Sequence, residues 1–188
     1  MFNINRTIRL LMISDVFSLT GFGLIDPILA IFIKENLEGG TVFTAGLAAG
    51  LFLITKSLVQ IPFSLKVDQQ KNKIPFLLAG MIIVTLVPLI YIFSQNIYWI
   101  YVAQILHGLG AGLAFPAWLG LWSVSLDKGR ESFEWSFYST ITSVGMAITG
   151  ALGGALAQFV GFRATFAVVS LLSFIGCLIL LRLTVKRA

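Results

Sequence analysis

The apolar run from Leu10 to Ile33, LLMISDVFSLTGFGLIDPILAIFI, most restricts the folds open to this chain. A helix needs about 20 apolar residues to cross a bilayer, and this run is long enough. It nevertheless contains two acids, Asp15 and Asp26, and Asp26 directly precedes Pro27. A charge at the centre of a membrane helix costs about 2.5–3.5 kcal/mol on insertion scales, so an acid retained there is a candidate functional residue.

Five further apolar runs follow, separated by short polar segments. The 188 residues are 57% apolar and only 11% charged, whereas a soluble domain has about 25% charged residues. The continuous runs lack the alternation of a membrane β-barrel. The sequence therefore predicts an all-α integral membrane protein, with residues 1–188 forming one bundle of six spans at about 10–33, 42–65, 74–94, 97–123, 133–159 and 164–182.

Lys and Arg are distributed unequally between the two ends of these spans. One side has Arg6, Arg9, Lys66, Lys71, Lys73, Lys128, Arg130, Arg182, Lys186 and Arg187, and the other has Lys34 and Arg163. Because cytoplasmic loops are enriched in basic residues, we expect a multi-pass protein of the cytoplasmic (plasma) membrane with both termini in the cytoplasm. The same rule accounts for the net charge of +5, so no nucleic-acid partner is predicted. The first run exceeds a signal-peptide core and is expected to be a mature span.

Polar residues and glycines are concentrated in four spans. The spans at 74–94 and 164–182 are almost purely apolar and are expected to face lipid. Three of the other spans contain G-x-x-x-G, a spacing that lets two membrane helices approach closely. We therefore predict helix packing at these glycines, the alternative being that glycine is simply common in membrane helices. They are Gly46 and Gly50, Gly108 and Gly112, and Gly150 and Gly154.

Two pairings follow from depth, since each helical residue advances about 1.5 Å. Asp15 and Lys56 have similar depths, which predicts a structural ion pair, unless Lys56 extends to the membrane surface along its own stem. Asp26 and His107 also match in depth. Together they have the chemistry to bind and release a proton, and Asp26 would attract a cationic substrate. The alternatives are that Asp26 supports the kink at Pro27 and that His107 packs in the core.

No enzyme is predicted. The chain has one histidine and no H-E-x-x-H, P-loop or G-x-S-x-G motif. The single cysteine, Cys177, has no metal-ligand spacing around it and is interpreted as a packing residue. No metal or other cofactor is predicted.

A polar loop between the second and third spans carries the first of several family motifs. Its sequence, SLKVDQQKNK at residues 64–73, is similar to the G-x-x-x-D-R-x-G-R-K/R loop of the major facilitator superfamily. Asp68 and Lys73 match this cytoplasmic loop motif. The chain departs from it at Ser64, Gln69, Lys71 and Asn72.

Two later stretches follow in that family's order. QILHGLGAG, residues 104–112, resembles R-x-x-Q-G-x-G-A, with Gln104 in place of the arginine and His107 in place of the glutamine. MAITGALGGA, residues 146–155, resembles the antiporter motif G-x-x-x-G-P-x-x-G-G, with Ala151 in place of the proline. The chain as a whole thus resembles the N-terminal half of a major facilitator superfamily transporter.

This resemblance implies two inverted three-helix repeats and proton-linked efflux of small molecules by alternating access. It implies a second six-helix bundle as partner, either another copy or a C-terminal half. Since the first and fourth spans line the cavity in this family, it places Asp26, His107 and Gln104 at the substrate and proton-coupling site, although Gln104 cannot carry the arginine's charge. The alternative is a non-transporting bundle that acts as a folding unit or interaction subunit. A channel is a weaker alternative, since the sequence has no ring of charges.

Overall fold

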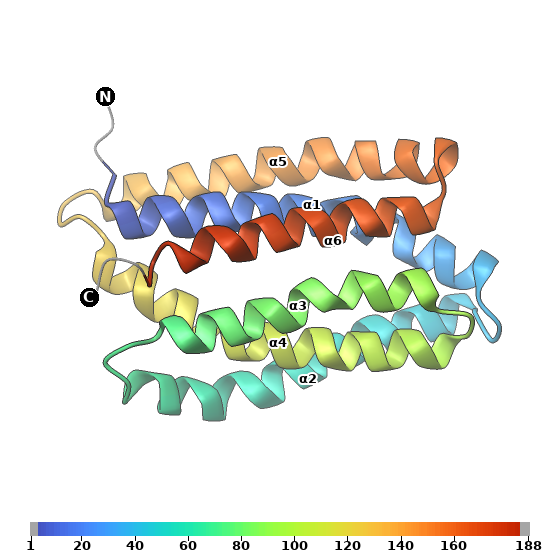
Figure 1. Ribbon diagram of the computed structural model, residues 1–188, viewed down its shortest axis with the longest axis horizontal. Helices are drawn as coiled ribbons and strands as arrows, with labels where there is room; N and C mark the ends of the chain where they lie inside the picture. The colour runs from blue at the N-terminus through green and yellow to red at the C-terminus, as the bar shows by residue number, and fades with distance from the viewer. Residues whose placement is uncertain (1–3, 185–188) are drawn as a thin grey trace.

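The computed structural model describes residues 4–184, and six α-helices account for most of them (Figure 1). All six are long and apolar enough to cross a membrane. This confirms the predicted all-α membrane fold. The helices are α1 (Arg6–Asn36), α2 (Val42–Asp68), α3 (Ile74–Phe93), α4 (Ile97–Ser125), α5 (Glu131–Phe159) and α6 (Phe162–Leu181).

Several helices extend beyond the predicted apolar spans, and at the start of α1 a polar cap accounts for the extension. α1 begins at Arg6, where the Asn5 side chain accepts a hydrogen bond from the Thr7 N–H at 2.9 Å. α2 begins after a capping box in which Thr41 and Thr44 each bond the other's backbone. Hydropathy marks only the part of a helix that the membrane surrounds.

The contacts between helices divide the bundle into two matching halves. α1 packs against α5 and α6, while α4 packs against α2 and α3, and α3 and α6 join the halves. Exchanging α1–α3 with α4–α6 leaves this pattern unchanged, as expected for two inverted repeats. In Figure 1, α5 and α2 lie at opposite edges, above and below the other four helices.

The edge position leaves α2 and α5 the least buried helices. Only 11% of the most apolar window of each is buried inside the bundle, against 39–50% for the other four helices. The almost purely apolar α3 and α6, expected to face lipid, pack against each other and still expose one face each. α2 and α5 therefore expose a larger share of their residues than the other four helices do.

Close helix approach occurs at one of the three predicted glycine pairs. A Cβ added at Gly108 would lie 2.7 Å from the Phe52 carbonyl oxygen, and one added at Gly112 would lie 2.9 Å from the Lys56 carbonyl oxygen. These two glycines let α4 approach the α2 backbone.

Within this bundle the other two predicted glycine pairs make no close contact with a neighbouring helix. A Cβ added at Gly46, Gly50 or Gly154 would meet nothing within 4 Å, and at Gly150 the nearest atom would be 4.0 Å away. These glycines lie on the outward faces of α2 and α5. α5 approaches α1 instead through Gly145 and Gly153, which pack against Thr20 and Leu24. Spacing alone cannot say which face of a helix meets a neighbour.

Candidate functional site

His107 lies where α1, α2 and α4 meet in the middle of the bundle. Its ring stacks on Phe22 of α1, with ring centroids 4.6 Å apart, and lies 4.4 Å from the Phe52 ring of α2. Gln104, one turn earlier on α4, is buried. The imidazole is thus held by aromatic rings from two helices.

Asp26 lies on α1 one turn beyond Phe22, on the same side of the helix. Within residues 4–184 no hydrogen bond or ion pair joins Asp26 to His107. Asp26 is exposed in the bundle, and it interacts electrostatically with Tyr91 of α3. The structure therefore places both predicted coupling residues near the α1–α4 junction without bonding one to the other.

The predicted ion pair between Asp15 and Lys56 is not present. Asp15 accepts a hydrogen bond from the Tyr138 hydroxyl of α5 at 2.9 Å. Lys56 points towards α4, where its Nζ lies 5.0 Å from the centroid of the Phe115 ring. The two side chains leave their helices towards different neighbours, so their similar depth does not bring them together. Among the described residues Lys56 has no carboxylate partner and lies close enough to His107 to interact electrostatically.

An aromatic cluster from α4 and α5 lies beside Asp15. The Trp118 and Trp122 rings stack with centroids 4.9 Å apart, and Trp135 and Tyr138 pack on them. This cluster was not predicted from the sequence. Its signal was present, because residues three and four apart share a helix face. What the sequence did not reveal is that Tyr138, 123 residues away in the chain, meets Asp15.

The loop motif residues Asp68 and Lys73 come together at the end of α2. The Lys73 Nζ donates to the Val67 carbonyl at 2.9 Å and lies 3.6 Å from the Asp68 Oδ1. Its stem packs against α4 at Gly120, where a Cβ would lie 2.8 Å from the Lys73 Cδ. Lys73 thereby caps the last turn of α2 and holds the loop against α4.

A buried acid near the start of α5, Glu134, was not predicted. Its side chain is fully buried near the start of α5, and its Oε2 accepts the backbone N–H of Asp127 at 3.2 Å. This bond ties the α4–α5 loop to α5. Acidic side chains are favoured in the first turns of a helix, where they accept hydrogen bonds from nearby backbone N–H groups. The position of Glu134 at the start of a predicted span was therefore the sequence signal for this bond.

The outward surface of α5 has two sides of different chemistry. One side is small and polar, and the other is apolar, as expected for a helix that meets two different environments. The first comprises Ser136, Ser139, Ser143, Gly150, Gly154 and Gln158, and the second comprises Phe137, Ile141, Val144, Ile148 and Leu152. We refer to these as the small-polar side and the apolar side of α5. α2 shows the same division, with Gly46, Gly50, Ser57, Gln60 and Ser64 on its small-polar side.

Residues 4–184 contain no group of three or more His, Cys, Asp or Glu side chains placed to hold a metal ion. The site consists instead of single charged and polar side chains at the junction of α1, α2 and α4. Small-polar sides are present on α2, which forms part of this junction, and on α5, which packs against α1. Six membrane helices in two inverted repeats, with isolated charges on the inner helices, define a bundle of the secondary-transporter type.

Comparison with known proteins agrees with this class. The family model of the Major Facilitator Superfamily matches residues 11–188. The chain belongs to the Major Facilitator Superfamily.

Relatives in this family are distant in sequence. The inner membrane transport protein YajR of Escherichia coli is 26% identical over 166 residues, covering 87% of this chain and 36% of YajR. The quinolone resistance protein NorA of Staphylococcus aureus is 22% identical over 181 residues, covering 94% of this chain and 45% of NorA. The chain therefore spans less than half the length of the relatives it matches.

A solved structure shows the same fold. A crystal structure of a mutant peptide transporter POT in complex with sulfate superposes with a TM-score of 0.73 at 14% identity, covering 97% of this chain and 38% of that protein. At this identity the likeness establishes the arrangement of helices alone.

Proposed function

We propose that this chain is one six-helix half of a secondary active transporter that exports small molecules in exchange for protons. The observation that carries the proposal is the set of membrane-embedded charges that no opposite charge neutralises. Asp26 is exposed on α1, and Lys56 on α2, whose Nζ lies 5.0 Å from the Phe115 ring centroid, has no carboxylate partner among the described residues. Charged groups at membrane depth are costly and mark substrate and proton pathways.

The second bundle of the proposed transporter would pack over the small-polar sides of α2 and α5. These sides are exposed here, and their glycines would let partner helices approach closely. A substrate site would then lie between the two bundles, beside Asp26, Lys56 and His107. The length of the relatives, at more than twice this chain, supports a second bundle as the occupant.

Within this transporter we assign Asp26 to proton binding and to attraction of a cationic substrate, with His107 and Gln104 at the same cavity wall. The membrane would be the cytoplasmic membrane. α1 begins and α6 ends at the same end of the bundle, where the Arg6 Nη2 donates to the Arg182 carbonyl at 3.3 Å. Because that end carries most of the Lys and Arg residues, both termini would be cytoplasmic.

Flux in vesicles tests this proposal. The chain, alone or coexpressed with a separate six-helix C-terminal half, is reconstituted, and efflux of a lipophilic cationic dye is measured under an imposed pH gradient. We expect pH-dependent flux that Asp26→Asn abolishes and that Glu35→Gln, a matched exposed acid near the end of α1, leaves intact. Flux that Asp26→Asn does not alter would disprove the coupling role.

The alternative is that this bundle does not transport a substrate and serves as a folding unit or interaction subunit. A chain that is monomeric in mild detergent and mediates no flux with or without a second half would favour that function. Self-association with flux favours the transporter.

A further inference from the structure

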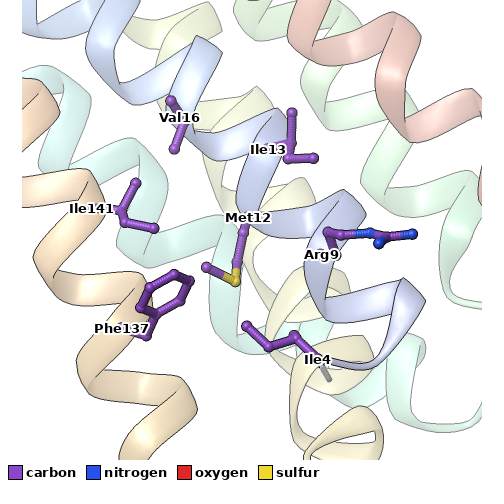
Figure 2. Close-up of a pocket in the computed structure, with 7 residues that line it drawn as sticks. All are labelled: Ile4, Arg9, Met12, Ile13, Val16, Phe137 and Ile141. Carbon is purple, nitrogen blue, oxygen red and sulfur yellow. The ribbon is translucent and has the colours of Figure 1, made fainter. Parts of the chain in front are cut away.

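A crevice of about 300 Å³ lies between α1 and α5, at the end of the bundle where α1 begins (Figure 2). Six of its lining side chains are apolar, and the seventh is Arg9. The apolar ones are Ile4, Met12, Ile13, Val16, Phe137 and Ile141. None of these residues belongs to the transport site proposed above.

The crevice opens away from the interior of the bundle. Ile13 is two residues before Asp15, so their side chains leave α1 about 200° apart. Asp15 points towards Tyr138 and the aromatic cluster, whereas Ile13 is 40% exposed. On the α5 wall, Phe137 and Ile141 belong to the apolar side and not to the small-polar side. The crevice therefore faces acyl chains and not the second bundle.

Arg9 lies at the rim of the crevice, one turn before Ile13 and within the first turns of α1 (Figure 2). Its guanidinium is exposed and makes no hydrogen bond or ion pair with any other described residue. The neighbouring Arg6, in contrast, is engaged by the Arg182 carbonyl. Arg9 is thus a cation without a partner among residues 4–184, at the level where an apolar crevice reaches the membrane surface.

This combination matches the two chemical parts of a phospholipid. A guanidinium binds phosphate oxygens with paired, charge-assisted hydrogen bonds. Basic side chains at the membrane surface favour anionic headgroups over neutral ones. The apolar walls below Arg9 suit an acyl chain. An acyl chain bound there would be separated from the mobile chains of neighbouring lipids.

We propose that the crevice between α1 and α5 binds one anionic phospholipid, with its phosphate on Arg9 and an acyl chain along Met12, Val16 and Ile141. The lipid lies in the leaflet at the end of the bundle where α1 begins. It bridges α1 and α5 on the side opposite the Asp15–Tyr138 hydrogen bond. The site is independent of the proposed transport function, because none of its residues faces the second bundle.

Lipid retention by the purified full chain tests the proposal. The chain in mild detergent is titrated with phosphatidylglycerol or phosphatidylcholine, and bound lipids are counted by native mass spectrometry. We expect one tight phosphatidylglycerol molecule, held about tenfold more weakly by Arg9→Gln because a charge-assisted phosphate contact is lost. The matched control is Arg163→Gln on α6, an exposed arginine at the opposite end of the bundle, which should not change binding.

Two variants test the crevice itself. Val16→Trp fills the crevice with a large side chain. Ile13→Gln makes an exposed lining position polar, and it provides the test if Val16→Trp does not fold. Either should weaken phosphatidylglycerol binding while Arg9 is intact. Unchanged lipid binding in Arg9→Gln would overturn the proposal. The proposal would also be overturned if inorganic phosphate bound at Arg9 as well as phosphatidylglycerol does and if the crevice variants left lipid binding unaltered. A loss of self-association in Arg9→Gln without a change in lipid binding would instead assign the crevice to a protein partner.

Discussion

The Tyr138 hydroxyl of α5 donates a hydrogen bond of 2.9 Å to the Asp15 carboxyl of α1. Asp15 lies within the membrane-spanning part of α1. The bond therefore joins two helices that belong to different three-helix repeats. Beside it, the Trp118, Trp122 and Trp135 rings pack on the Tyr138 ring. The α1–α5 contact is thus polar at one point and otherwise made by small and apolar residues.

Removing the hydroxyl should destabilise the bundle. Tyr138→Phe leaves the buried Asp15 carboxyl without this donor, and an unsatisfied buried polar group costs about 1–3 kcal/mol. The measurement is the thermal unfolding midpoint of the chain in detergent. The control is Tyr98→Phe, whose ring is largely exposed at the start of α4 and should be neutral. Equal midpoints for the two variants would contradict the role of this bond.

A double-mutant cycle should separate Asp15 from Lys56. Because the two side chains do not meet, Asp15→Asn and Lys56→Gln should have additive effects on unfolding free energy, within about 0.5 kcal/mol. Asp15→Asn and Tyr138→Phe should instead couple. Rescue of Asp15→Asn by Lys56→Gln would show that the pair forms after all.

The close contact of α4 with α2 should make Gly108 intolerant of any side chain. Gly108→Ala places a methyl against the Phe52 carbonyl and should cost about 1–3 kcal/mol through forced separation of the helices. Gly46→Ala, in open space on α2, provides the matched control and should be neutral or slightly stabilising. Unfolding in detergent measures both. Similar losses for the two variants would refute this assignment.

The lysine at the end of α2 should stabilise the loop locally. Lys73→Met removes the hydrogen bond to the Val67 carbonyl, worth about 0.5–1.5 kcal/mol, while keeping most of the stem that packs at Gly120. Hydrogen exchange should accelerate at residues 68–73 with little change in α5. Lys71→Met, an exposed neighbour, should leave exchange unchanged. Faster exchange throughout the bundle would point to a global and not a local role.

Bulk on the small-polar side of α5 should interfere with a second bundle. Gly154→Trp should reduce self-association, or pairing with a separate C-terminal half, without altering the helix content. Leu152→Trp, two residues away on the apolar side, should leave association unchanged because that side faces lipid. Crosslinking in membranes distinguishes the two variants. If Leu152→Trp is the more disruptive change, the assignment of the two sides is reversed.

The sequence alone determined the fold class and the six spans. In lipid a continuous apolar run of this length satisfies its backbone hydrogen bonds by forming a helix. Hydropathy is therefore sufficient to locate the six spans. The family was also visible, in Asp68, Lys73 and the glycines of α4, because these sit in local motifs. The start of α1 was displaced because the Asn5 cap extends this helix beyond the apolar run.

Only the tertiary structure decided which residues meet. Similar depth in the membrane predicted that Asp15 and Lys56 would pair. Depth is only one coordinate of a side chain, and the rotation of each helix about its axis determines which neighbouring residue the side chain meets. That rotation is set by packing, for example by Gly153 against α1 and Gly112 against α2. It turns Asp15 to Tyr138, Lys56 to Phe115 and Arg9 to the rim of a crevice. A single sequence records the composition of a helix face, whereas the partner of that face depends on residues that are distant in the chain.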